Sequence, residues 1–265
     1  MRDFIFALIA IFVFGFFVVW MLLVASVPVS AYVVQDNTGV LNTTRTKLLL
    51  TTGSGTSFSD TSAGGINKTI SRFGDTMWTS VSLNFGKNTI YFDGTGDYLT
   101  ANVSSDFNFS SNDWTVDAFV NVKACSPFCS IYEVGNGDLY LTGGFYMAFY
   151  IQTGGTNYMN MRIENSNGNG FGLDYQQPIT MSMGTFYHYA FVYNNGVFSF
   201  YQNGVSQYSS AISSPKFPTG INRIIVGALD TPLYDNTGYI SNLRVTNGLA
   251  LWKKNFNPPN RFSDQ

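Results

Sequence analysis

The chain has 265 residues, with 14 basic and 16 acidic side chains and a pI near 5.2. Charged residues make up 11% of the chain and aromatic residues 17%, and the few Lys and Arg are scattered. This pattern excludes nucleic acid as an expected partner, because phosphate backbones are bound by concentrated basic surfaces. Low charge, many aromatic residues and turn-forming residues between apolar runs are typical of an all-β protein.

The N-terminal residues 4–27 are apolar and carry no charge. About 24 residues at a rise of about 1.5 Å make a helix of roughly 36 Å, enough to cross a hydrocarbon core of ~30 Å. Cleavage after the small residues 29–31 is the alternative, but this apolar run exceeds the core of a usual signal peptide. We therefore expect a transmembrane anchor at 1–27, or a signal segment that extends to residue 31.

The charge distribution predicts how the chain is oriented. No basic side chain follows Arg2 until Arg45, so we expect the N-terminus in the cytoplasm or the virion interior and the remainder outside, in a single-pass membrane protein. Residues 28–46 lack periodicity and indicate a stalk, and residues 47–262 form the predicted domain. Four N-x-[ST] triplets are candidate glycosylation acceptors, although an Asn-, Ser- and Thr-rich sequence also produces them by chance: Asn42, Asn67, Asn102 and Asn108.

Short alternating runs between turn residues predict antiparallel strands along the domain. The clearest is 113–122, where every even-numbered position from Trp114 onward is apolar. Two Asn-Gly pairs, at 195–196 and 203–204, predict a three-stranded meander, because Asn-Gly turns match the twist of hairpins. The expected strands are 47–50, 88–92, 98–99, 113–122, 145–152, 157–164, 186–193, 197–202, 205–208, 221–228 and 238–245, whereas the Gly-rich 165–172 indicates a loop.

The two cysteines, Cys125 and Cys129, enclose only three residues. In an oxidising compartment this spacing favours a disulfide over free thiols. A loop this short contributes only about 2 kcal/mol, so the disulfide would order a local loop. Zinc is not expected, because zinc takes four donors and His188 is the single histidine of the chain.

An ordered set of segments carries a family resemblance over about 48–259. These segments are KLLL (47–50), FSDTS (58–62), YFDGTGDYL (91–99), DWTVD (113–117), FYHYA (186–190), QNG (202–204), GYISNLRV (238–245), ALW (250–252) and FNPP (256–259). Together they resemble the laminin-G-like or concanavalin A-like jelly-roll domains of secreted and viral surface proteins, and the closing block is similar to versions in phage proteins. The resemblance implies two antiparallel sheets of a jelly-roll sandwich, with glycan or protein ligands bound on a concave face or by rim loops.

Many members of this family hold calcium, and the resemblance implies Asp93 and Asp97 as ligands, since hard oxygen donors suit Ca²⁺. Ser241 stands where many relatives carry an aspartate, and the two aspartates would equally cap a tight turn, so both interpretations stay open. Two further loops combine aromatic rings with amide or carboxylate groups, which suits sugar binding. The candidate ligand contacts in them are Asn167, Asn169, Phe171, Tyr234 and Asp235.

No catalytic residue is predicted. Glycosidases of this fold use paired carboxylates on one strand, and the only glutamates here, Glu133 and Glu164, lie on separate segments. His188 sits in an alternating aromatic run that indicates a structural role. The sequence therefore predicts a non-catalytic, membrane-anchored glycan-binding or adhesion module on a virion or cell surface, with a glycan or a surface protein as partner and with scope for an oligomer. Alternatives are a structural spike or shell protein of a virus and, more weakly, a polysaccharide-cleaving enzyme.

Overall fold

The computed structural model describes residues 44–51, 53–81, 88–109, 113–135, 146–164, 171–212, 221, 223–229 and 234–258. In these ranges no helix is long and apolar enough to cross a membrane. The expected anchor at 1–27, most of the stalk, Asn42, and the loop candidates Asn167 and Asn169 lie outside them.

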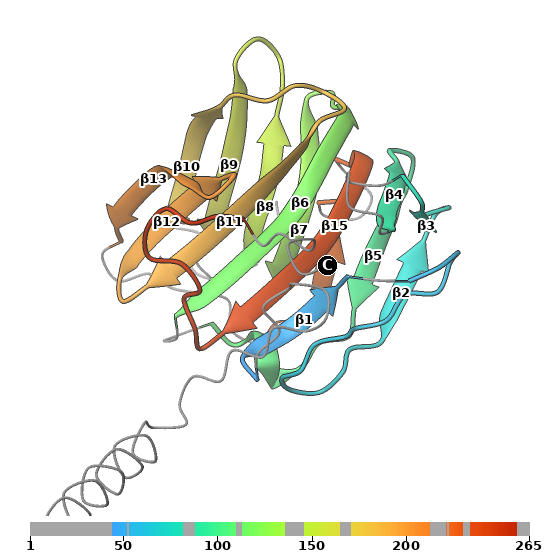
Figure 1. The fold of residues 1–265 in the computed structure, drawn as a ribbon, viewed down its shortest axis with the longest axis horizontal. Coiled ribbons are helices and arrows are strands. Elements are labelled where there is room, and N and C mark those ends of the chain that lie inside the picture. Colours follow the sequence, from blue (N-terminus) through green and yellow to red (C-terminus); the bar gives the residue numbers. More distant parts are fainter. Residues whose placement is uncertain are drawn as a thin grey trace, which may run out of the picture. The chain divides into compact units, whose positions relative to one another are not determined.

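Two antiparallel sheets form the described part of the chain (Figure 1). The eight-stranded sheet has the order β13 (Val205–Ala211), β12 (Val197–Gln202), β11 (Phe186–Asn194), β6 (Trp114–Ala124), β15 (Thr237–Asn247), β4 (Thr89–Asp93) and β3 (Met77–Thr79), with β1 (Thr46–Leu50) also paired to β15. The seven-stranded sheet has the order β10 (Phe171–Ile179), β9 (Asn157–Glu164), β8 (Tyr146–Gln152), β7 (Phe128–Gly135), β14 (Arg223–Val226), β5 (Tyr98–Ala101) and β2 (Ile70–Phe73). A 3₁₀ helix, η1 (Ser105–Phe107), follows β5. The all-β, two-sheet sandwich expected from the sequence is confirmed.

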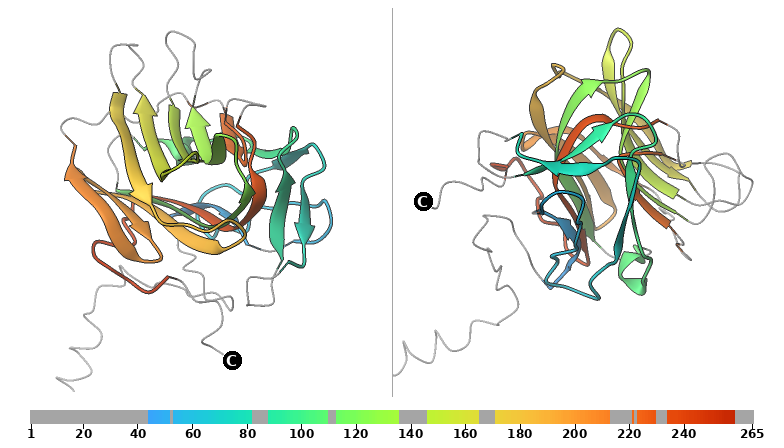
Figure 2. Two further views of the ribbon diagram at one scale, coloured as in Figure 1. Left: turned by 90° about the horizontal axis from the view of Figure 1, so that it is seen from above. Right: turned by 90° about the vertical axis from the view of Figure 1, so that its right-hand side faces the viewer.

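Aromatic rings dominate the core between the sheets, which Figure 2 shows as two layers. Alternation along each strand turns every second side chain inward, as predicted for β6. Trp114 of β6 lies with its ring centroid 6.3 Å from that of Phe149 of β8, on the opposite sheet. Phe149 in turn stacks on Phe191 of β11 with centroids 3.8 Å apart. These contacts between the layers bury the apolar faces of both sheets.

Part of the outer face of the eight-stranded sheet is covered by the C-terminal strap, which we define as residues 249–258. Figure 1 shows this dark-red segment crossing in front of β11 and β12. Trp252 and Phe256 of the strap stack on each other, with ring centroids 4.0 Å apart, and both meet the ring of His188 edge-on at 5.6 and 5.8 Å. Because the strap excludes water, polar side chains on this outer face are buried. His188 is one of them, and its Nε2 lies 3.1 Å from the Asp117 carboxylate.

Candidate ligand-binding pocket and acidic cluster

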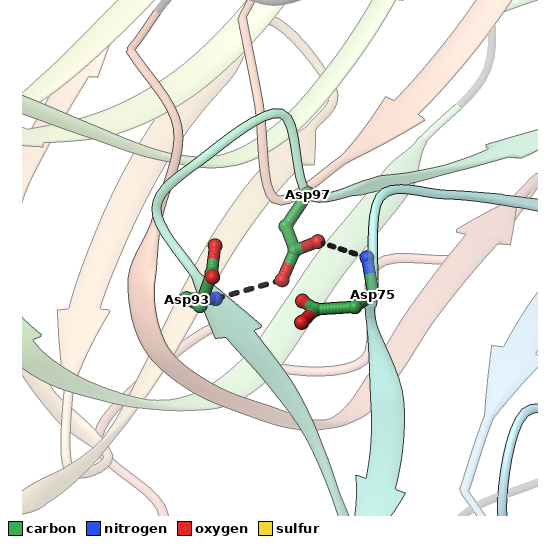
Figure 3. Close-up of side chains that lie close together, drawn as sticks. All are labelled: Asp75, Asp93 and Asp97. Carbon is green, nitrogen blue, oxygen red and sulfur yellow. Dashed lines mark hydrogen bonds between the residues drawn. The ribbon is translucent and has the colours of Figure 1, made fainter.

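Asp97 forms hydrogen bonds with two turns that connect the sheets at one end of the sandwich. The β4–β5 and β2–β3 turns each pass from one sheet to the other. The buried Asp97 carboxylate accepts backbone N–H bonds from Asp75 and Asp93, both at 2.7 Å (Figure 3). It also accepts the Thr76 N–H at 3.1 Å. One side chain therefore satisfies amides of both turns, which is the turn-capping role that the sequence left open for it.

Three carboxylates converge at this point, as Figure 3 shows. Oxygen atoms of Asp75, Asp93 and Asp97 all lie within 4.8 Å of one another. Burial raises the pKa of Asp97; the amides of Asp93 and Asp75 lower it, and the charges of the same two aspartates raise it again, for a net increase. Within the described ranges, no Lys, Arg or His forms an ion pair with these groups.

The donor set of this acidic cluster fits a hard cation such as Ca²⁺. Carboxylate oxygens are the ligands that Ca²⁺ prefers, and closely spaced carboxylates without a basic partner repel one another until a cation separates them. Asp75 and Asp93 would supply most of the free lone pairs, because Asp97 already accepts three backbone N–H bonds. Asp93 accepts one such bond, from the Thr95 N–H. A bound ion would supply charge neutralisation here. The sequence identified Asp93 and Asp97 but missed Asp75, which lies 18 residues before Asp93.

A pocket of about 410 Å³ adjoins the acidic cluster. Strand register explains its position, because Thr237 at the start of β15 pairs with Asp93 on one side and with Ala124 on the other. The turn after β4, the loop after β6 and the segment before β15 therefore meet at one sheet end. The residues that line the pocket are Gly94, Ala124, Cys125, Ser126, Phe128, Tyr234, Asp235 and Thr237.

The aromatic wall of the pocket is the pair Phe128 and Tyr234, whose rings meet edge to face with centroids 4.8 Å apart. Tyr234 adopts a positive φ of 56°, a conformation that costs a non-glycine residue free energy and that tends to occur at functional sites. Its carbonyl accepts the Ser130 N–H at 3.1 Å, which anchors the segment to β7. The ring of Tyr234 is thus presented by a backbone fixed in an unusual conformation.

Asp235 is the charged group of the pocket. Its Oδ2 accepts the Gly96 N–H at 2.7 Å, while its buried Oδ1 has no hydrogen-bond partner in the described structure. Burial raises the pKa of Asp235; the Gly96 amide lowers it and the charge of Asp93 raises it, for a net increase. The next residue, Asn236, is fully buried, and neither atom of its side-chain amide has a partner among the described residues. Unsatisfied buried polar atoms are costly, so Asp235 and Asn236 carry a free-energy cost in the folded chain.

The remaining wall comes from the loop between β6 and β7, where Cys125 and Cys129 form a disulfide. Cys125 lines the pocket and Cys129 is buried in the core. The short loop that the sequence assigned to a disulfide is therefore also a boundary of the candidate site.

The structure brings together some of the predicted site residues and not others. Tyr234 and Asp235 share the pocket, and Asp93 and Asp97 lie beside it. Phe171 begins β10, so the loop expected over 165–172 ends earlier than predicted. Phe171 is also remote from the pocket, because β10 lies three strands away from β7, the strand that borders the pocket. Three candidate glycosylation acceptors are exposed, and their modification stays a prediction: Asn67, Asn102 and Asn108.

Two candidate carboxylates, those of Glu133 and Asp97, are not placed for glycoside hydrolysis. Glu133 is buried, and its carboxylate lies 2.6 Å from the Arg223 guanidinium. Within the acidic cluster, Asp97 is buried and its oxygens accept amide N–H bonds, so it is not placed to attack or protonate a sugar.

An antiparallel two-sheet jelly roll with a polar and aromatic pocket at its rim is the class of protein that these observations define. A family model described as the concanavalin A-like lectin/glucanases superfamily matches residues 93–251, more than half of the chain. The chain belongs to this superfamily, which confirms the resemblance seen in the sequence. None of the curated protein sequences matches it.

Several solved structures share the fold. The binding domain of Paraclostridial mosquitocidal protein 1 has a TM-score of 0.60 and 14% identity, covering 78% of this chain and 50% of that chain. The binding domain of botulinum neurotoxin DC, in complex with rat synaptotagmin II, has a TM-score of 0.60 and 12% identity, covering 78% and 49%. The same binding domain in complex with SialylT has a TM-score of 0.60 and 13% identity, covering 78% of this chain and 49% of that chain. The chain thus spans about half the length of these structures, and at such identities the likeness is one of fold.

Proposed function

We propose that this chain is a non-catalytic glycan-binding module and that the pocket beside the 93–97 turn is its ligand site. The observation that carries the proposal is the combination, in one pocket, of the Phe128 and Tyr234 rings with the Asp235 carboxylate. Aromatic rings pack against the C–H faces of sugars, and carboxylate oxygens accept hydrogen bonds from hydroxyl groups. A volume of about 410 Å³ lies in the range of small-molecule sites.

The comparisons support a binding role. The superfamily includes lectins and glucanases, and the similar solved structures are binding domains, one in complex with SialylT and another with rat synaptotagmin II. Glycans and surface proteins are therefore the partner classes that the comparisons favour, and the pocket chemistry favours the glycan. The Glu133 carboxylate is paired with Arg223 and the Asp97 carboxylate accepts backbone N–H bonds, which supports binding without catalysis.

The proposal includes display on a membrane. The uncharged apolar segment at 4–27 supports an anchor that holds the sandwich outside a cell or on a virion. The disulfide supports an oxidising location, because disulfides persist outside reducing compartments.

A glycan array probed with the full chain in detergent micelles tests the proposal. We expect binding to a restricted set of glycans, and Tyr234→Ala should weaken it by about tenfold or more because it removes the aromatic wall. Tyr208→Ala is the matched control: Tyr208 stacks on Tyr175 at 3.9 Å, and its strand, β13, is the edge of the eight-stranded sheet remote from β15. Failure of the wild-type chain to bind any glycan, or equal losses in both variants, contradicts the proposal.

A further inference from the structure

Four aspartates gather around the pocket from separate parts of the chain. Asp235 lines it, Asp93 immediately precedes the lining residue Gly94, and Asp75 and Asp97 complete the acidic cluster next to Asp93. The hydrogen bond from Gly96 to Asp235 joins the acidic turn directly to the pocket wall. When ionised, these groups place one negative charge each around a single cavity.

None of these four aspartates forms an ion pair in the part of the chain that the structure describes, although the Arg72 guanidinium donates a hydrogen bond to the Thr76 carbonyl beside the acidic cluster at 3.1 Å. The ion pairs there involve other acids, namely Asp106, Asp117, Glu133 and Asp174. Lys123 precedes the lining residue Ala124, but it does not line the pocket, and its ammonium lies 5.6 Å from the centroid of the Tyr239 ring. The lining contains hydroxyl, aromatic and carboxylate groups and no cation.

We infer that the pocket selects its glycans by charge, preferring sugars with a free amine to uncharged sugars and excluding sugars that carry a carboxylate. This inference rests on the proposed function and specifies its ligand class. An ammonium group in the pocket can pair with the Asp235 carboxylate and lie against the Phe128 and Tyr234 rings, which attract cations through their π faces. A sugar carboxylate at the same place would meet like charges without a counter-ion, and such contacts strongly disfavour a partner.

The charge selectivity should depend on pH and on divalent cations. Because the pKa of Asp235 is raised, its carboxylate is neutralised at a higher pH than that of an ordinary aspartate, and the preference for amines is lost as the pH falls through this range. A Ca²⁺ ion in the acidic cluster would offset two of the four negative charges. The remaining charge would still be negative, so the pocket would still prefer amines to carboxylates. Binding is therefore compared both in EDTA and in calcium.

The test uses glycan pairs that differ in charge on a shared backbone. Glucosamine oligomers are compared with N-acetylglucosamine oligomers, and lactose with sialyllactose, on an array probed with the full chain in detergent micelles. We expect the amine member to bind about tenfold more tightly than its acetylated partner and the sialylated member about tenfold more weakly than lactose, in every pair with measurable binding. Asp235→Asn keeps an acceptor for the Gly96 N–H and should reduce both ratios.

Asp174→Asn is the matched control, since it removes the same charge from an exposed carboxylate on the edge strand β10 and should leave both ratios unchanged. Equal or tighter binding of the carboxylate-bearing members overturns this inference and leaves the proposed function standing. If Asp174→Asn changes the ratios as much as Asp235→Asn, the selectivity comes from net charge and the inference also fails. Binding that persists in Tyr234→Ala, or no binding at all, removes the proposed site and the charge selectivity together.

Discussion

Asp117 shows how this sandwich accommodates a buried charge. It projects from β6 under the C-terminal strap and accepts hydrogen bonds from the Arg244 guanidinium at 2.8 and 2.9 Å, while His188 Nε2 lies 3.1 Å away. Burial alone would raise the pKa of Asp117, but Arg244 and His188 together outweigh it and hold the pKa below its usual value. This interaction stabilises the folded chain fully at a pH above the pKa that the Asp117 carboxyl has in the unfolded chain. The stabilisation is lost as the pH falls through the lower pKa of Asp117 in the folded chain.

Replacing this carboxylate should be costly. Asp117→Asn leaves the buried Arg244 without its counter-charge, and we expect a loss of about 3–5 kcal/mol in the free energy of unfolding. Asp174→Asn breaks the more exposed pair with Arg162, 3.3 Å apart, and should cost about 0–1 kcal/mol. Urea unfolding of the two variants measures the difference. Equal losses would show that the buried pair has no special role in stability.

The acidic cluster leads us to predict that calcium stabilises the folded chain. If Asp75, Asp93 and Asp97 hold Ca²⁺, calcium should raise the midpoint of thermal unfolding relative to EDTA, because a ligand that binds only the folded state stabilises it. Asp93→Asn should abolish the increase, whereas Asp174→Asn should retain it. A midpoint unaffected by calcium in the wild-type chain would leave these aspartates with only their turn-capping role.

The two Asn-Gly turns have similar backbone φ angles but different neighbouring atoms. Asn195 and Asn203 have φ of 45° and 50°, and the glycines that follow them have φ of 85° and 75°. A Cβ on Gly204 would lie 1.9 Å from the carbonyl oxygen of Phe256, whereas a Cβ on Gly196 would meet nothing within 4 Å. The second hairpin therefore depends on its glycine both for its turn and for contact with the strap.

This difference predicts unequal effects of one substitution. Gly196→Ala should cost about 1–2 kcal/mol, the strain of a left-handed alanine. Gly204→Ala should cost about 1–3 kcal/mol more, because the added methyl displaces the strap backbone that donates the Phe256 N–H to the Gly204 carbonyl. Chemical denaturation followed by tryptophan fluorescence compares the variants, and Trp252 reports on the strap. Comparable costs at both glycines would mean that the strap adjusts freely.

For the whole molecule, the pocket lies where connections from both sheets converge. The β4–β5 turn crosses from one sheet to the other, and β15 pairs with both β4 and β6 at the same end. This topology collects side chains from positions 75, 93–97, 124–128 and 234–237 at one rim. A site of this kind can vary in its loops while the paired strands behind it stay the same.

Membrane attachment is a prediction for the entire chain. We expect the full-length protein to resist extraction from membranes at alkaline pH and a C-terminal tag to be accessible to antibody on intact cells, because the apolar segment spans the bilayer. A variant that begins at residue 35 is the control and should be released. Recovery of a mature protein that starts near residue 32 would show instead that the leader is a cleaved signal.

Local sequence pattern was enough to predict much of the sandwich. The meander of β11, β12 and β13 was predicted from alternation and Asn-Gly turns, and β6 from its even-numbered apolar face. These features depend on neighbours along the chain, which the sequence displays directly. The superfamily and the candidates Asp93 and Asp97 were predicted from the family resemblance, and Tyr234 and Asp235 from the chemistry of their loop.

Elements that depend on distant neighbours were missed. β7 is buried on both faces, so it lacks the alternation that marks a half-exposed strand. β2 and β3 are edge strands of four and three residues, and the edge strand β10 contains Pro178, which an edge tolerates. The sequence therefore contained too little local signal for these four strands.

Most of the longer strands and both Asn-Gly turns follow from the amino-acid sequence, as do the residue types available for sugar or cation binding. Three features of the site come from the folded arrangement: Asp75 joins Asp93 and Asp97, Phe128 faces Tyr234, and the four aspartates form no ion pair among the described residues. The reason is that strand pairing and crossover between sheets bring together residues far apart in the chain. Their charges and rings interact through space, at distances that sequence separation does not specify.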